Sequence, residues 1–468
     1  MFKGLNAIRM GGREVLPLVE GGKGVSATNH MSSGAWAAAG GIGTVSAVNA
    51  DSYDSDDNII PQIYRAPTRR DRHEELIVYA VNGAVDQVTR AYDIASGQGA
   101  ININVLWEMG GAQRVLTGVL ERTRGLVSGV TCGAGMPYKL SEIAAHYGVY
   151  YYPIISSARA FRALWKRAYS KASEWLGAVV YEDPWLAGGH NGLSNAEDPL
   201  QPQDPYPRVR DLRSVMRESG ISDDVPIIMA GGVWYLREWE NWIDNPELGT
   251  IAFQYGTRPL LTQESPIPQA WKQRLMTLRE GDISLHQFSP TGFYSSAVRT
   301  PFLRDLEDRS ERQIGFSMEQ GGDHQFALDV GVGRGRAFYV TRDDLLRARG
   351  WAGQGFTDAL KTPDNTLVLV TPADKKIIRK DQADCMGCLS QCRFSAWADS
   401  EKNSTGRLAD PRSFCIQKTL QDVAHGGNPE ENLVFAGHSA YRFAQDPFYS
   451  NGFVPTVKQL VERIQTGD

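Results

Sequence analysis

Short apolar runs alternate with amphipathic segments of helical period along residues 1–300. The runs are rich in branched side chains, as expected of parallel strands that are covered on both faces. They occupy residues 44–48, 101–106, 126–132, 151–155, 178–181, 226–229 and 250–254. One long helix is predicted from Ser157 to Trp175, another from Pro137 to Gly148, and a third around residues 209–216. The alternation predicts a (β/α)8 barrel, although a doubly wound open sheet has the same rhythm.

The rhythm ends near residue 300, where the chain becomes more polar and mixed. We therefore expect three parts: a barrel over residues 1–300, a long insertion over 301–384, and a cysteine-cluster segment with a closing helix over 385–468. Within the insertion, residues 366–370 read as a short strand. An amphipathic final helix is expected around residues 457–464.

Composition limits the classes of function. The chain has 468 residues, and 42% of them are hydrophobic, as in ordinary soluble globular proteins. Its formal net charge is −5, so the chain lacks the overall positive charge that attracts nucleic acid. No apolar stretch approaches the roughly 20 residues that span a bilayer. The first dozen residues lack the apolar run of a signal peptide. We expect a soluble, cytoplasmic protein with no membrane span.

Four of the five cysteines crowd the last quarter of the chain. Cys385, Cys388 and Cys392 are separated by two and three residues, and Cys415 follows after 22 more. In a reducing compartment, clustered thiols suggest a metal site before disulfides. A four-iron four-sulfur cluster suits three close thiolates and one remote thiolate. Zinc is the main rival, and unligated thiols are the remaining alternative. Cys132 reads as a buried apolar residue.

Glycine turns follow the last two predicted strands. Gly231 and Gly232 come after one of them, and Gly256 and Thr257 come after the next. At the carboxyl ends of late barrel strands, such turns let backbone N–H groups approach a phosphate, although a plain tight turn explains a single pair equally well. No G-x-G-x-x-G pattern follows an early strand, which argues against a Rossmann dinucleotide site.

His190 lies among glycines after the strand predicted at residues 178–181. Barrel enzymes place catalytic side chains at the carboxyl ends of strands, and a pKa near neutrality suits imidazole to proton transfer. The alternative is a histidine that only bonds to loop backbone.

An ordered set of motifs resembles the nitronate monooxygenase (2-nitropropane dioxygenase) family of FMN barrels over about residues 15–300. The motifs are Gly133-Ala134-Gly135-Met136-Pro137, Ile154-Ile155-Ser156-Ser157-Ala158, Ala187-Gly188-Gly189-His190, Ala230-Gly231-Gly232-Val233 and Gly256-Thr257-Arg258. The four cysteines, with Phe288-Ser289-Pro290-Thr291-Gly292 and Phe435-Ala436-Gly437-His438, resemble the iron–sulfur branch typified by acyl-carrier-protein dehydrogenase/isomerases. That branch is expected to have a shorter chain in place of residues 301–384.

The resemblance implies a set of FMN positions, with Glu182 and Asp183 as alternatives for a position that is glutamine in many relatives. The set is Gly22, Asn104, Glu182 or Asp183, Gly188, Gly231, Gly232, Gln254, Gly256 and Thr257. It also implies that Cys385, Cys388, Cys392 and Cys415 hold a four-iron four-sulfur cluster.

The activity implied by this likeness is oxidation of an acyl thioester, linked to acyl carrier protein, at Cα–Cβ, with or without isomerisation of the double bond, as in unsaturated fatty-acid synthesis. His190 would be the base, O₂ a candidate electron acceptor, and a homodimer is compatible with the family. The alternative within the family is a nitronate monooxygenase that oxidises alkyl nitronates or other small molecules with O₂. The alternative of another class is a non-catalytic binding protein that carries the cluster.

Overall fold

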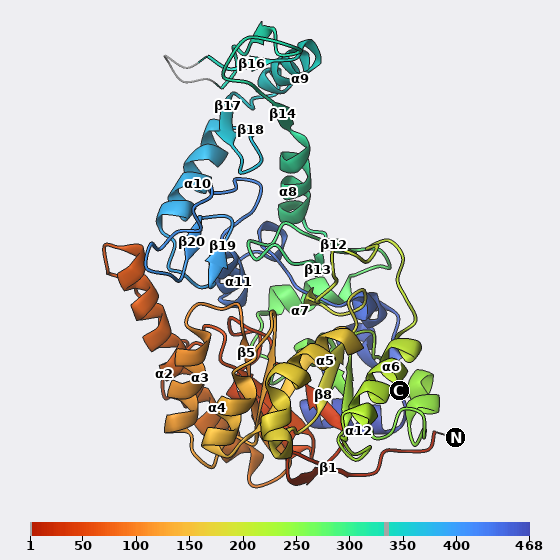
Figure 1. The fold of residues 1–468 in the computed structure, drawn as a ribbon. Coiled ribbons are helices and arrows are strands. Elements are labelled where there is room, and N and C mark those ends of the chain that lie inside the picture. The colour runs from red at the N-terminus through yellow and green to blue at the C-terminus, as the bar shows by residue number, and fades with distance from the viewer. Residues whose placement is uncertain (1, 332–336) are drawn as a thin grey trace.

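The computed structural model describes residues 2–331 and 337–468, and its centre is a closed barrel of eight parallel strands (Figure 1). The closure confirms the barrel and rejects the open sheet. In barrel order the strands are β3 (Leu18–Glu20), β4 (Ile42–Ser46), β5 (Ala100–Leu106), β6 (Gly129–Gly133), β7 (Tyr150–Ile155), β8 (Val179–Glu182), β10 (Ile227–Ala230) and β11 (Ile251–Tyr255), and β11 pairs with β3. With only three residues, β3 was too short to be recognised from its sequence.

Helices cover the outside of the barrel. They are α1 (His30–Ala38), α2 (Arg69–Ala95), α3 (Ala112–Arg122), α4 (Leu140–Tyr147), α5 (Ala158–Arg167), α6 (Pro205–Glu218), the short η2 (Leu236–Trp242) and the chain's last helix α12 (Val457–Gln465). The apolar face of α12 joins the barrel core and packs against α1, so α12 takes the eighth helix position. The single long helix predicted after Ser157 is wrong, because Ala168 leaves the helical region and a separate turn, η1 (Tyr169–Trp175), follows.

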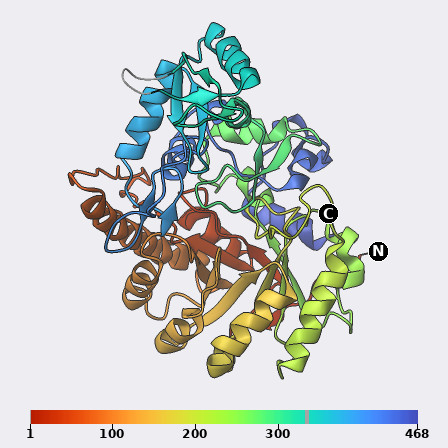
Figure 2. The same ribbon diagram turned by 45° about the horizontal axis from the view of Figure 1, so that its top comes forward.

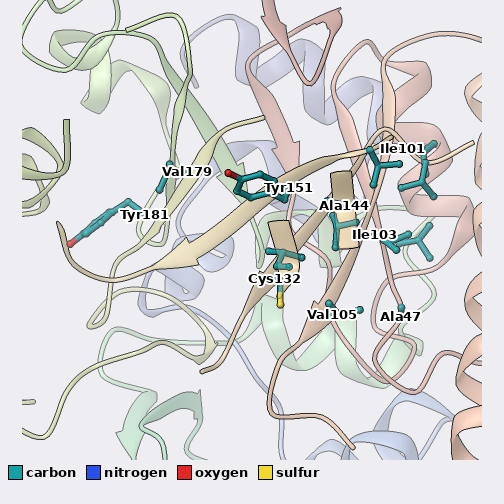
Figure 3. Packing of buried hydrophobic residues seen from close by; sticks show 14 of the residues in the cluster. Ala47, Ile101, Ile103, Val105, Cys132, Ala144, Tyr151, Val179 and Tyr181 are labelled. Carbon is teal, nitrogen blue, oxygen red and sulfur yellow. The ribbon is translucent and has the colours of Figure 1, made fainter. Parts of the chain in front are cut away.

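The two faces of each strand bury two different cores. Ile101, Ile103 and Val105 of β5 pack outward against the helices, together with Tyr151 and Val179 (Figure 3). The inner core is formed by residues of the alternate strand positions, and the hairpin of β1 (Ile8–Met10) and β2 (Arg13–Val15) contributes Met10 and Val15 to it. Because side chains alternate along a strand, this pattern decides which residues face the barrel axis.

The insertion builds a small unit of its own that stands away from the barrel (Figures 1 and 2). Helices α8 (Pro301–Glu311) and α10 (Pro372–Ala383) connect it to the rest of the chain. Its other elements are β14 (Gln313–Gly315), β15 (Phe326–Ala327), β16 (Tyr339–Val340), α9 (Arg342–Gly353), β17 (Asp358–Lys361) and β18 (Thr366–Val370), around a separate apolar cluster. The predicted strand at residues 366–370 is confirmed as β18.

The cysteine segment returns to the carboxyl end of the barrel. It contains β19 (Gln391–Cys392), β20 (Trp397–Ala398) and α11 (Ile416–Ala424). The N–H of Gly110, after β5, donates to the carbonyl of Cys388 at 3.0 Å, and the His73 ring bonds to the carbonyl of Gly387 at 2.9 Å. Residues from both ends of the chain therefore border the same end of the barrel. Within the described ranges, no helix combines the length and apolar character needed to cross a membrane.

Candidate functional site

Polar side chains form the top inner layer of the barrel. Asn104, Thr131, Glu182 and Gln254 occupy inward positions near the carboxyl ends of β5, β6, β8 and β11. Asn104 pairs directly with Thr131, Glu182 and Gln254 both pair with Ala230, and all four side chains line the same cavity. Because every second residue of a strand points toward the barrel axis, these polar residues, which are far apart in the sequence, together face one cavity.

Two cavities adjoin above this layer. The larger one is lined by Gly22, Asn104, His190, Cys388 and Gln417, among others. The smaller one is lined by Gly231 and Gly232 of the first glycine turn. Both are bordered by five predicted residues, which are Glu182, Gly188, Gln254, Gly256 and Thr257. Every predicted cofactor residue except Asp183 therefore lies on one continuous surface.

Glu182 and Asp183 have different surroundings although they are adjacent. Glu182 is the last inward residue of β8 and faces the cavity. Burial, together with the neighbouring Asp183 charge, raises the pKa of Glu182 to about 8, so its carboxyl group is largely protonated at neutral pH. Asp183 is fully buried and accepts hydrogen bonds from the N–H groups of Trp185 and Leu186 at 2.9 and 2.8 Å. Asp183 shapes the turn, and Glu182 is the residue available to a ligand.

His190 belongs to a small sheet, of which only the first strand lines the cavity. Its short strand β9 (Gly189–His190) pairs with β13 (Ser295–Val298), which pairs with β12 (Ile283–His286). The His190 Nε2 atom bonds to the Ser289 hydroxyl at 2.6 Å, and Phe435 packs edge-on against the ring. Burial lowers the pKa of His190 to about 4. The ring is therefore neutral at pH 7 and has a lone pair that can accept a proton.

Two further histidines lie near His190 and were not identified as site residues from the sequence. The ring of His286, on β12, contacts the Ser295 hydroxyl at 3.4 Å, and burial lowers its pKa to about 3. His438 bonds to the Ser296 hydroxyl at 3.1 Å, and burial lowers its pKa as well. Glycine-flanked placement identified His190, whereas His286 follows no glycine turn, and His438 was noted only within a family motif.

The loop after β3 is strained where it borders the cavity. Val25 and Ser26 have φ of 52° and 62°, in the left-handed region that branched side chains rarely adopt. The Ser26 hydroxyl donates to buried Asp51, whose carboxylate also bonds to His425 at 2.7 Å. His425 directly follows α11, so the C-terminal segment helps to hold this loop in its shape.

The four clustered cysteines share one apolar cluster beside the cavity. Cys385, Cys388 and Cys392 are buried within it, and Cys415 packs against it. Burial, and then the neighbouring thiols, raise the pKa of Cys388 well above its usual range. In the part of the chain that the structure describes, no three or more histidine, cysteine or acidic side chains are arranged to hold a single metal ion. Cys132 lies apart on β6, buried in the barrel core.

Nearby donors act on these thiols. The backbone N–H groups of Gln417, Lys418 and Ser395 lower the pKa of Cys388, Cys415 and Cys392, respectively, against the larger effect of burial, which raises it. The Ser395 hydroxyl also donates to the Cys385 sulfur at 3.1 Å. Donors of this kind favour thiolates and metal-bound sulfur.

Comparison with known proteins gives a family and a fold. The family model described as nitronate monooxygenase matches residues 13–467. FabK from Thermotoga maritima is similar in structure, with 15% identity, a TM-score of 0.52 and coverage of 96% of this chain and 92% of that chain. The enoyl reductase domain of MlnA from the macrolactin biosynthesis cluster of Bacillus amyloliquefaciens is similar at 11% identity, with a TM-score of 0.54 and coverage of 96% and 93%. At these identities the two likenesses concern the fold. A search among curated proteins found no match.

Proposed function

Because this chain belongs to the nitronate monooxygenase family, we propose that it is an FMN-dependent oxidoreductase that oxidises an acyl thioester, carried by acyl carrier protein, at Cα–Cβ. The observation that carries the proposal is the neutral, enclosed His190 in a cavity continuous with the glycine-lined one. A base and a glycine-lined recess in one surface suit a flavin enzyme that removes a carbon-bound proton.

The residues present fit FMN. The Asn104 Oδ1 atom, on the cavity wall, is buried without a hydrogen-bond partner among the described residues. The protonated Glu182 carboxyl both donates and accepts, as the glutamine amide of many relatives does. Gly22, Asn104, Glu182, Gly188 and Gln254 would hold the ring and ribityl chain, and Gly231, Gly232, Gly256 and Thr257 would hold the phosphate. When bound, FMN supplies a two-electron acceptor.

Gly256 allows a direct test of the phosphate position. A Cβ added at Gly256 would meet nothing within 4 Å, so a larger side chain fits the protein and enters only the open cavity. We expect Gly256→Val to fold normally, as judged by circular dichroism and thermal unfolding, but to bind FMN at least tenfold more weakly. Fluorescence titration of flavin-stripped protein measures this affinity. Unchanged affinity would place the phosphate elsewhere.

The cysteine segment is proposed to hold a four-iron four-sulfur cluster. Four thiols in one apolar cluster, with N–H and O–H donors aimed at the sulfurs, match the ligands of such a cluster. A zinc ion draws its four sulfurs to roughly 3.8 Å from each other, whereas a cube of iron and sulfide keeps its thiolates further apart. Elemental analysis of anaerobically purified protein decides between iron and zinc.

The activity test compares two substrates. An acyl carrier protein thioester mixed anaerobically with the enzyme should bleach the flavin absorbance, and an alkyl nitronate should do so slowly or not at all. His190→Ala should keep FMN and iron but lose roughly 100-fold or more in the rate of bleaching. Bleaching by nitronate alone would favour the second candidate, nitronate oxidation, which the description of the matching family model supports. Protein purified without flavin would favour a binding function.

We also propose that residues 1–300, 301–384 and 385–468 are the functional parts of the chain. The separate apolar cluster of the insertion supports treating it as a unit. Deleting residues 313–370 and joining α8 to α10 by a short linker should preserve FMN binding.

A further inference from the structure

One polar side chain on the cysteine-segment side of the cavity has an unused donor. Gln417 lies in the first turn of α11, is 1% exposed and lines the cavity. Its Oε1 atom accepts a hydrogen bond from Asn49 Nδ2 at 2.6 Å, while its Nε2 atom is buried without a partner among the described residues. A buried amide that lacks one partner is costly unless something else pairs with it.

The surroundings of Gln417 limit what that partner can be. The cavity that Gln417 lines is also lined by the apolar side chains of Val48, Met109, Leu389, Ile416 and Leu420. An amide donor in an apolar wall suits a ligand with one polar group on a hydrocarbon chain. Asn49 fixes the amide plane, so the donor is oriented before the ligand arrives.

We propose that the Gln417 side-chain amide binds the carbonyl oxygen of the acyl thioester. This inference rests on the proposed function and deepens it. Loss of the Cα proton to His190 places negative charge on the thioester oxygen, and a fixed neutral N–H donor stabilises that charge as it develops. His190, after β8, and Gln417, on α11, come from separate elements and line the same cavity. The C-terminal segment then contributes a substrate-binding group as well as the cysteines.

The position of Gln417 also links the substrate to the cysteines. Gln417 lies two residues after Cys415, at the start of α11, and it lines the same cavity as Cys388. Ordering of the thiols by a metal therefore orders the residue that carries the donor. We expect substrate affinity, and not only electron transfer, to depend on the integrity of the cysteine site.

The test changes the Gln417 side chain and the carbonyl group of the ligand, each alone and both together. Gln417→Met keeps the length of the side chain and removes the donor. Gln421→Met makes the same change one turn further along α11, away from the cavity, and is the matched control. The ligands are a medium-chain acyl thioester of N-acetylcysteamine and the matching thioether, in which a methylene group replaces the carbonyl. Binding is followed by perturbation of the flavin spectrum, and turnover by anaerobic flavin reduction.

We expect Gln417→Met to retain FMN and iron at parental levels and to lose about 100-fold in kcat/KM for the thioester. Its affinity for the thioether should be unchanged, and Gln421→Met should match the parent for both ligands. Equal weakening of the two ligands, loss of FMN, or unchanged affinity and turnover with the thioester would each overturn the assignment. If the parent binds the thioester but never reduces its flavin, the proposed oxidation fails, and the comparison of the two ligands still decides the role of Gln417.

Discussion

The depressed pKa of His190 gives a measurable pH profile. Imidazole with its ordinary pKa near 6.5 is only about 10% neutral at pH 5.5, whereas with a pKa of about 4 it is more than about 95% neutral. If His190 is the base, kcat/KM should stay level from about pH 7 to about pH 5, where Glu182 stays protonated, and should fall on the acid side only as the pH approaches 4. At pH 5.5 the enzyme should be about tenfold more active than one with an unshifted histidine.

The same shift makes a prediction for stability. Between pH 6.5 and pH 4, His190 binds a proton in the unfolded chain but not in the folded protein. The free energy of unfolding therefore falls as the pH falls through this range. A shift of this size corresponds to at most about 3 kcal/mol, and less to the extent that the cavity admits water. His190→Gln should therefore lose less stability than the parent between pH 7 and pH 5 in chemical denaturation.

Stopped-flow flavin reduction across pH 4.5–8 is the decisive assay. His146, which is exposed on α4, provides the control variant His146→Asn, and its profile should overlay that of the parent. A parental rate that is halved near pH 6.5 would show that His190 is not enclosed as described. A His190→Ala variant that reduces its flavin at the parental rate would show that another group removes the proton.

Three other changes probe the cofactor sites. Cys415→Ser should lose most of the iron, measured by elemental analysis, whereas Cys132→Ser, in the barrel core, should keep it. Gly22→Ala should weaken FMN binding at least tenfold in fluorescence titration, because the added Cβ would collide with the Asn104 side chain. An affinity equal to that of the parent would show that this loop does not contact the flavin. Asp51→Ala should reduce the free energy of unfolding by about 2–3 kcal/mol in urea denaturation, because Ser26 and His425 would lose their hydrogen-bond partner. A change within experimental error would show that Asp51 does not stabilise the loop.

The sequence was informative where function depends on local pattern. Parallel strands read as apolar runs, so seven of the eight barrel strands were located to within a few residues. Glycine turns at strand ends indicated where a phosphate could lie, because a turn is local. The three-residue β3 has no pattern long enough to detect, and the insertion showed only its β18 strand.

Contacts between distant residues were beyond such reasoning. Asn49 and Gln417 are 368 residues apart, and Asp51 and His425 are 374 apart. Nothing in the periodicity of either segment indicates that they meet. The distinction between Glu182 and Asp183 was different, since it follows from strand parity once the end of β8 is known. The residue at which β8 ends could not be read from the sequence alone.

The arrangement of the site explains why the C-terminal segment returns to the barrel. The strands alone provide the inward ring of Asn104, Glu182 and Gln254, which is open at the top. Phe435 packs against the His190 ring and β13 pairs with its strand, and burial lowers the pKa of His190 so that the ring stays neutral. A base exposed to water would lose both its depressed pKa and the low dielectric that strengthens a nearby amide donor. The C-terminal segment that carries the cysteines therefore covers the barrel and also contributes to the surroundings that keep His190 neutral.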